Sequence, residues 1–243
     1  MSEPKEKLIV ALDVSTREEA LGLCDQLADV VGAFKIGLQL FTAEGPSLVR
    51  EIASRGHKIF LDLKFHDIPN TVASAAVEAS RLGVWMINVH ASGGKEMMER
   101  TVEAVREDCL KRGTVKPLLI GVTVLTSSDE GNLAEVGVNS SVDSQVERLV
   151  RLAIGSGMDG VVSSANEVGR IKALDASGSF IAVTPGIRPA EATFDDQKRV
   201  TSPRQAIVNG SDFIVVGRPI SKASDPIAVA SGIVDDIASA NRL

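Results

Sequence analysis

This sequence contains few aromatic residues and has no excess of positive charge. Aromatic side chains make up 3% of the 243 residues, with no tyrosine and one tryptophan, and the formal net charge is −6. Proteins that bind nucleic acids use basic patches to contact phosphates and, on single strands, aromatic rings to stack on bases. The composition supports neither mode of binding, so we expect no nucleic-acid partner.

Cysteines and long apolar runs are also few. The two cysteines, Cys24 and Cys109, lie far apart in segments of helical character, so we expect two reduced thiols rather than a disulfide framework. No apolar stretch approaches the roughly 20 residues that a membrane-spanning helix needs. Residues 1–7 are polar and lack the pattern of a secretory signal. We therefore expect a cytoplasmic protein with no membrane partner.

Short apolar runs alternate with longer segments of helical periodicity throughout the chain. Eight such runs can be identified, at residues 8–13, 33–38, 58–63, 85–90, 117–124, 159–163, 180–184 and 212–216. Near-continuous apolar runs are typical of buried parallel strands, and eight βα units in about 240 residues match the (β/α)8 barrel. We predict an α/β fold with a single TIM-barrel domain over residues 1–243.

A doubly wound open sheet is the alternative to this barrel. Open sheets that bind nucleotides usually have a glycine-rich G-x-G-x-x-G turn after the first strand, or a P-loop. The chain contains neither motif. The barrel is therefore the favoured architecture.

Local signals predict where several helices begin. Residues 15–19 have the S/T-x-x-E spacing of a capping box, in which two side chains satisfy the first free backbone N–H groups of a helix. Pro69 suits the first turn of another helix. Apolar residues at helical spacing predict a helix with one buried face at Val142, Val146, Leu149, Val150 and Ala153.

Charged residues inside apolar strands are the most informative feature, because an unpaired buried charge is costly. Asp62 and Lys64 should point to the same face, since strand residues alternate. Lys35 lies inside the preceding strand, and Asp67 follows Lys64 by three residues. We predict an alternating array in which each of these charges neutralises the next.

The alternative for any one of these residues is an ion-pair network that only fixes strand register. Four such residues at strand ends favour an active site, because TIM-barrel sites form at the C-terminal ends of the strands. Asp13 ends the first apolar run and could equally help to cap the following helix. Taken on its own, Asp13 therefore favours this capping role over a role in a site.

A glycine and an arginine follow each of the last two strands. They are Gly186 and Arg188 after the seventh run, and Gly217 and Arg218 after the eighth. Free backbone N–H groups, a helix N-terminus and a guanidinium can together hold a phosphate, and barrels often place phosphate sites after strands seven and eight. Turn glycines beside surface arginines are the alternative for either motif alone.

The sequence gives no support for a metal centre. The histidines His57, His66 and His90 are isolated, H-E-x-x-H is absent, and the cysteines lack ligand spacing. Asp13, Asp62 and Asp67 have suitable oxygens for Mg²⁺, but the lysines interleaved among them would repel the cation. We expect neither a metal ion nor a cofactor.

Several segments resemble the orotidine 5'-monophosphate decarboxylase family, which catalyses the last step of UMP synthesis. The most specific is D-x-K-x-x-D-I-P-N-T, which begins at Asp62 and ends at Thr71. The resemblance spans nearly the whole chain, through residues 11–13, 34–37, 62–71, 123–127, 184–188 and 216–220.

The resemblance implies a TIM barrel and a role for each charged residue. Lys64 would protonate C6 of the pyrimidine as carbon dioxide leaves, and Asp62 would lie against the departing carboxylate. Lys35 and Asp67 would complete the charge array. The family is also expected to form a homodimer with shared active sites, in which the partner subunit supplies Asp67 and Thr71.

The resemblance further implies how orotidine 5'-monophosphate would be bound. Asp13 and Lys35 would hold the ribose, and Thr126 would meet the pyrimidine. The phosphate would be held by Gln197, Gly217 and Arg218, with help from Arg188. Gln197 belongs to a long segment, residues 186–202, that could close over the ligand.

Two other functions are possible on the same residues. A sugar-phosphate decarboxylase or hexulose-phosphate synthase would share the D-x-K-x-x-D strand but use Mg²⁺ and an enediolate, and the Ile68–Thr71 continuation argues against it. A catalytically silent sensor of phosphorylated ligands is the second, since a fold does not dictate a function. Intact Asp62 and Lys64 argue against a silent sensor.

Overall fold

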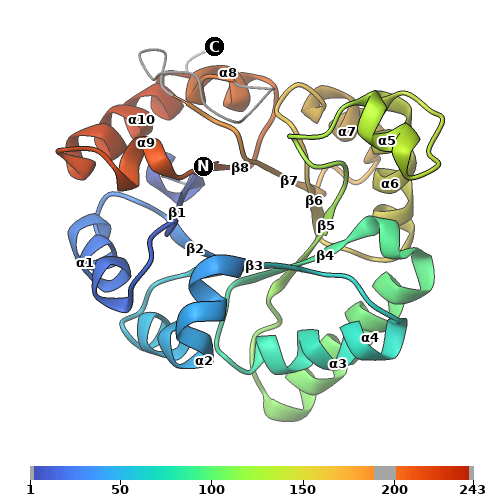
Figure 1. Cartoon of the computed structure of the whole chain (residues 1–243), viewed down its shortest axis with the longest axis horizontal. Helices are drawn as coiled ribbons and strands as arrows, with labels where there is room; N and C mark the ends of the chain where they lie inside the picture. The colour runs from blue at the N-terminus through green and yellow to red at the C-terminus, as the bar shows by residue number, and fades with distance from the viewer. Residues whose placement is uncertain (1–2, 189–200, 241–243) are drawn as a thin grey trace.

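The computed structural model describes residues 3–188 and 201–240. Eight parallel strands pair in chain order and close into a barrel, with helices around its outside (Figure 1). The strands are β1 Leu8–Ala11, β2 Ala33–Gly37, β3 Ile59–Phe65, β4 Met86–His90, β5 Leu118–Val122, β6 Gly160–Val162, β7 Ile181–Thr184 and β8 Phe213–Val216. The predicted TIM barrel is confirmed, and each predicted apolar run contains or overlaps one strand.

Two strand boundaries differ from the prediction in ways that affect the site. β1 ends at Ala11, so Asp13 lies in the following loop. β3 continues to Phe65, so Lys64 belongs to the strand. The prediction ended β3 at Leu63, because the apolar run stops there.

The helices form the outer layer of the barrel (Figure 1). They are α1 Arg17–Leu27, α2 Leu38–Ser54, α3 Pro69–Ser80, α4 Lys95–Arg112, α5 Glu130–Glu135, α6 Val142–Gly155, α7 Val168–Leu174, α8 Pro203–Val208, α9 Arg218–Ser221 and α10 Pro226–Ala240, with 3-10 turns η1 Pro4–Lys7 and η2 Ala91–Gly93. The predicted capping box begins α1, where the Thr16 side chain accepts from the Glu19 N–H and Glu19 accepts from the Thr16 N–H. Pro69 occupies the first turn of α3, also as predicted.

Two apolar layers stabilise this arrangement. One lies between the sheet and the helices, and includes the predicted apolar face of α6. The other fills the barrel interior with Ile9, Phe60, Met86, Ile120 and Val183 as its larger members. Full burial of such side chains contributes about 1.5–3 kcal/mol each. The interior is therefore a packed core, and the C-terminal ends of the strands are left for polar groups.

Ion pairs reinforce the opposite, N-terminal end of the barrel. Asp212 lies directly before β8, and its Oδ2 accepts the backbone N–H of Ala182 on β7 at 2.7 Å. The same oxygen lies 2.6 Å from Lys172 Nζ. Asp159 repeats this pattern before β6, where its Oδ2 accepts the backbone N–H of Leu119 on β5 at 2.7 Å. Residues at this end of a TIM barrel serve stability rather than catalysis.

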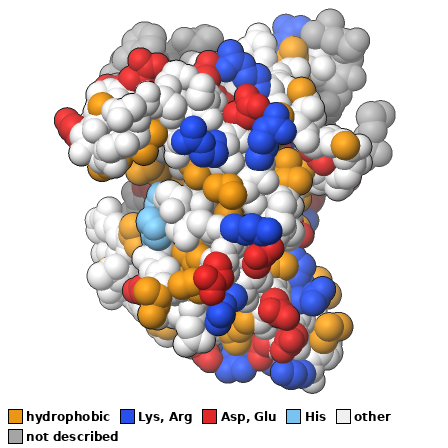
Figure 2. All heavy atoms as spheres, turned by 90° about the vertical axis from the view of Figure 1, so that its right-hand side faces the viewer, with side chains coloured by type: hydrophobic (Ala, Val, Ile, Leu, Met, Phe, Trp, Pro, Cys, Tyr) orange, Lys and Arg blue, Asp and Glu red, His pale blue; other side chains and the backbone are white. Residues whose placement is uncertain are grey.

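The surface helices carry charges of both signs. In Figure 2, acidic and basic side chains are interspersed over the face on which α4 to α6 lie. Several form pairs one turn apart, such as Arg151 with Glu147 at 2.7 Å and Arg112 with Asp108 at 2.6 Å. This face is an ordinary solvated surface of mixed charge.

Both cysteines are free, as predicted, and both are buried. Burial is the main cause that raises the pKa of the Cys24 thiol, to about 12, so the thiol stays protonated at neutral pH.

In the part of the chain that the structure describes, no helix combines the length and hydrophobicity needed to cross a lipid bilayer.

Candidate active site

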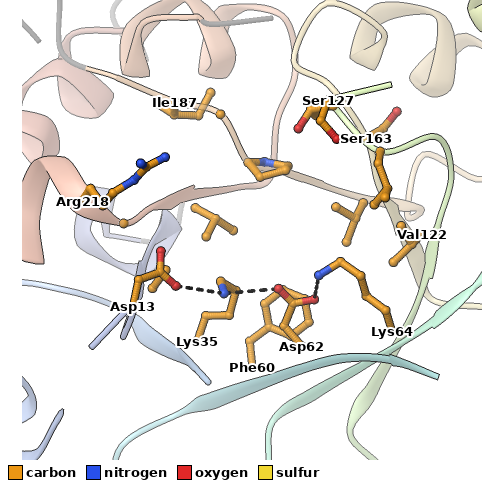
Figure 3. Close-up of a pocket in the computed structure, with 18 of the residues that line it drawn as sticks. Asp13, Lys35, Phe60, Asp62, Lys64, Val122, Ser127, Ser163, Ile187 and Arg218 are labelled. Carbon is orange, nitrogen blue, oxygen red and sulfur yellow. Dashed lines mark hydrogen bonds and ion pairs between the residues drawn. The ribbon is translucent and has the colours of Figure 1, made fainter. Parts of the chain in front are cut away.

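Four charged side chains form a line at the C-terminal end of the barrel (Figure 3). Lys35 Nζ on β2 lies 3.8 Å from Asp13 Oδ1 and 3.2 Å from Asp62 Oδ2. Lys64 Nζ lies 2.6 Å from Asp62 Oδ1. β2 and β3 are neighbours in the barrel, and Gly37 pairs with Asp62 across them. The Asp62 carboxylate is thus held between two ammonium groups.

Asp13 joins this line rather than capping α1. The N-cap residue of α1 is Thr16, whose hydroxyl accepts a backbone N–H of the first turn. The carboxylate of Asp13 instead faces Lys35. The helix-capping alternative for Asp13 is therefore wrong.

Asp62 is the most buried charge of the line, with 8% of its surface exposed. Burial is the largest single influence on its pKa and acts to raise it. The charges of Lys35 and Lys64, with hydrogen bonds from Lys64 and Asn88, together outweigh burial and leave the pKa of Asp62 below its ordinary value. Asp62 is therefore ionised at neutral pH.

Asn88 on β4 is a site residue that the sequence analysis missed. Its side chain is fully buried, donates from Nδ2 to Asp62 Oδ1 at 2.6 Å, and accepts the Lys64 backbone N–H at 2.8 Å. The only signal was a lone amide in the apolar segment 86–89, which a search for ionisable residues passes over. A buried amide inside a strand needs polar partners just as a buried charge does.

A cavity of about 360 Å³ opens above these charges. This volume is within the usual range for sites that bind small molecules. Its wall includes the apolar side chains of Phe60, Val122 and Val162. Of the predicted site residues, the wall contains Asp13, Lys35, Asp62, Lys64, Thr126, Arg188, Gly217 and Arg218.

The predicted phosphate-binding residues lie on the far side of this cavity. Figure 3 shows the Arg218 guanidinium at the end of the pocket opposite Lys64. Gly217 lies close to the Asp13 carboxylate, because a Cβ at this position would come within 2.5 Å of Asp13 Oδ2 and the end of that side chain would have to move aside. Gly186, near Arg188, has a φ of 79°, a conformation that favours glycine. Both glycines line the cavity beside the two arginines.

Comparison with known proteins places this arrangement in a family. A family model described as "Orotidine 5'-phosphate decarboxylase / HUMPS family" matches residues 6–233. The chain belongs to this family. The resemblance inferred from the sequence motifs is therefore confirmed.

Curated relatives and solved structures of this family agree with the match. The chain is 53% identical over 238 residues to orotidine 5'-phosphate decarboxylase of Syntrophotalea carbinolica, covering 98% of this chain and 97% of the relative. It is 52% identical over 231 residues to that of Legionella pneumophila, covering 95% and 99%. The crystal structure of the Lactobacillus acidophilus enzyme matches with a TM-score of 0.83 and 37% identity, covering 95% and 98%.

Two residues of the family motif lie apart from the charged line of their own chain. Asp67 is exposed, and its Oδ1 accepts the backbone N–H of Ile68 at 2.6 Å. Thr71 is exposed in the first turn of α3. Neither residue lines the 360 Å³ cavity. The expectation that Asp67 neutralises Lys64 within one chain is therefore not met.

Gln197 lies outside the described residues. The described ends of its segment lie side by side, because the Arg188 N–H donates to the Thr201 carbonyl at 3.1 Å and the Thr201 N–H donates to the Gly186 carbonyl at 3.4 Å. Arg188 lines the cavity next to this junction. The segment that contains Gln197 therefore begins and ends at the rim of the family's candidate active site.

The histidines near the site form no metal-binding group. The rings of His66 and His90 lie 5.5 Å apart. Burial, followed by the charges of His66 and Lys64, lowers the pKa of His90, so it is neutral at pH 7. Within residues 3–188 and 201–240, no cluster of three or more His, Cys, Asp or Glu side chains could hold a metal ion.

Proposed function

We propose that the chain decarboxylates orotidine 5'-monophosphate to UMP, with no cofactor or metal ion. The observation that carries this proposal is the placement of Lys64 Nζ at 2.6 Å from a buried, ionised Asp62, across the cavity from Arg218. The curated relatives at about half identity carry the name of this activity. The family description also names a HUMPS branch. The names of the curated relatives favour the decarboxylase branch.

The cavity suggests how the substrate would lie. Arg218, the backbone N–H of Gly217 and Arg188 would bind the phosphate, together with Gln197. Asp13 and Lys35 would hydrogen-bond the ribose, and Thr126 would contact the pyrimidine. The carboxylate on C6 would then face Asp62 and Lys64. Charge-assisted contacts to the phosphate are strong and geometrically specific, so they can hold the ring in one orientation.

The proposed chemistry depends on positive charge placed beside the leaving carbon dioxide. Breaking the C6–carboxyl bond leaves an electron pair on C6, and there is no cofactor to delocalise it. The Lys64 ammonium is already oriented by Asp62, so it stabilises this charge without reorganisation of the site. It then transfers a proton to C6 and yields UMP.

Asp62 would contribute by repelling the substrate carboxylate. Contacts to the phosphate supply binding energy that offsets this repulsion, and the repulsion is relieved as carbon dioxide leaves. Enzymes typically lower barriers by about 8–23 kcal/mol, more than one contact provides. The proposal therefore assigns catalysis to Lys35, Asp62, Lys64 and Asp67 acting together.

We further propose that the active chain is a homodimer with shared sites. Asp67 and Thr71 are exposed and lie apart from the cavity of their own chain. Exposed polar residues of a catalytic motif are accounted for if they complete the site of a partner subunit. In a symmetric dimer, the loop that contains Asp67 in each subunit would complete the site of the other subunit.

A cytoplasmic location is the remaining part of the proposal. The protein keeps two buried, free thiols in Cys24 and Cys109. Free thiols are usual in reducing compartments, where disulfides are rare.

A substrate comparison tests the proposed activity against the family alternative. Purified protein is incubated with orotidine 5'-monophosphate, and separately with a β-keto sugar-acid phosphate plus Mg²⁺, while carbon dioxide release is measured. The proposal expects release from the nucleotide alone, with UMP identified by mass spectrometry. Release from the sugar phosphate alone would assign the chain to the sugar-phosphate decarboxylases, and release from neither substrate would overturn the proposed activity.

A further inference from the structure

We infer that Asn88 is a positioning residue, which fixes the relative geometry of Asp62 and Lys64 and thereby the rate of the reaction. This inference rests on the decarboxylation proposed above and assigns it a further residue. Asn88 does not line the cavity, so it would act through its two neighbours rather than by touching the substrate.

The pairing between β3 and β4 shows why an amide is needed at this position. Leu61 pairs with Ile87, and the next paired residues are Phe65 and Val89. Three residues of β3 therefore bulge opposite a single residue of β4, which is Asn88. A bulge leaves backbone groups without their usual ladder partners. The Asn88 side chain takes the place of the missing partner by accepting the Lys64 N–H at 2.8 Å.

The backbone at Lys64 is strained. Its φ is 51°, and it is the one non-glycine residue with positive φ in the described ranges. Residues with a Cβ rarely adopt this conformation, and such strain persists only where the surroundings hold it. The hydrogen bond from the Lys64 N–H to Asn88 is a contact that holds it. The sequence analysis assumed that side chains alternate regularly along β3, and on that basis it predicted the contact between Asp62 and Lys64 correctly. In the structure, both residues lie in a bulge rather than in a regular strand.

The other end of the amide orients the carboxylate. Asn88 Nδ2 and Lys64 Nζ each lie 2.6 Å from Asp62 Oδ1, while Lys35 Nζ faces Oδ2. Asn88 thus donates a hydrogen bond to Asp62 and accepts one from the Lys64 backbone. An apolar side chain could do neither. An ionised aspartate could accept from Lys64 but would place a second carboxylate beside Asp62.

Two substitutions separate these contributions. Asn88→Ala removes both hydrogen bonds, and Asn88→Asp keeps the acceptor while losing the donor when ionised. The matched control is Thr101→Val, which removes the hydrogen bond from a fully buried hydroxyl to the Met97 carbonyl in α4. Thermal unfolding first verifies that all three variants are folded.

For Asn88→Ala we expect kcat to fall roughly 100-fold, because small displacements of catalytic groups have effects of this size. The KM should stay within about threefold, since the groups that bind the substrate are unchanged. Thr101→Val should keep kcat near that of the wild type. A near-normal kcat for folded Asn88→Ala, or a change confined to KM, would overturn the inference.

The pH dependence of Asn88→Asp adds a readout that a purely structural role would not move. The charged or titratable groups near position 88 are Asp62 and Lys64 on β3, Lys35 on β2 and His90 on β4, while β5 has none. A protonated aspartic acid can donate to Asp62 as the amide does. The ratio of variant to wild-type kcat should therefore rise as pH falls, and a ratio independent of pH would contradict the donor role.

A crystal structure of Asn88→Ala keeps this inference separate from the proposed function. If the wild type decarboxylates the nucleotide, the kinetic comparison decides. If the wild type proves inactive, the proposed function fails, but the backbone at position 64 still tests the positioning role. We expect φ of Lys64 to leave the positive region in the variant. An unchanged Lys64 and Asp62 would show that Asn88 does not hold them.

Discussion

Asp62 links the charges of the candidate site, because both ammonium groups lie within 3.2 Å of its carboxylate oxygens. Such a pair is costly to bury unless each charge is neutralised and hydrogen-bonded. Here Lys35, Lys64 and Asn88 meet that requirement. The ammonium group of Lys64 is therefore held in place before any substrate arrives.

Replacing Lys64 by alanine tests its assigned role. Lys64→Ala should reduce turnover of orotidine 5'-monophosphate by several orders of magnitude, because the ammonium acts mainly on the transition state. UMP should still bind, which calorimetry can measure. The control is Lys58→Ala, a lysine just before β3 at the opposite end of the barrel. Near-normal turnover of Lys64→Ala would exclude it as the proton donor.

Replacing Arg218 tests how the phosphate is bound. Arg218→Ala should lower kcat/KM for the nucleotide strongly, yet hardly change that for the nucleoside without phosphate, because only the nucleotide uses the guanidinium. Steady-state kinetics with both substrates give the comparison. Arg106→Ala, an exposed position on α4, should affect neither. Equal losses on both substrates would place Arg218 in another role.

At the scale of whole elements, strands and helices follow from local patterns, whereas the details of the site depend on pairing. The apolar runs predicted all eight strands, since a strand covered on both faces is apolar throughout. The bulge in β3 could not be predicted, because it arises from the register with β4, a separate part of the chain. Asn88 was missed for the same reason, since its importance appears only opposite that bulge.

The N-terminal end of the barrel makes a separate prediction about stability. Asp212→Ala removes the acceptor for the Ala182 N–H and the partner of Lys172. We expect a loss of about 1–3 kcal/mol in the free energy of unfolding, measured by urea denaturation, with turnover unchanged. Asp143→Ala is the control, because Asp143 pairs with Arg170 on the exposed surface. The loss in the free energy of unfolding for Asp143→Ala should stay within about 1 kcal/mol. Equal effects would show that the backbone contact adds nothing.

At the scale of the whole molecule, the open question is which subunit uses Asp67. A single sequence cannot decide this, because motif spacing is the same whether a residue serves its own chain or a partner. The structure places Asp67 on the surface, away from the cavity. The dimer proposed above gives that placement a function.

Mixing two inactive variants tests the shared site. If Lys64 of one subunit works with Asp67 of the other, a heterodimer of Lys64→Ala and Asp67→Ala contains one doubly altered site and one intact site. Random exchange makes half of the dimers mixed, so about a quarter of wild-type activity should return. Persistent inactivity, after mass spectrometry has verified heterodimers, would mean that Asp67 serves its own subunit.

Decarboxylation without a metal ion or cofactor is the central claim, and one assay tests it directly. Protein dialysed against EDTA is mixed with orotidine 5'-monophosphate, and the change in pyrimidine absorbance is followed in the continued presence of chelator. We predict the same rate as for untreated protein, because the charged line neutralises itself and its interleaved lysines disfavour a divalent cation. Complete loss of activity with EDTA, restored by Mg²⁺, would contradict the account.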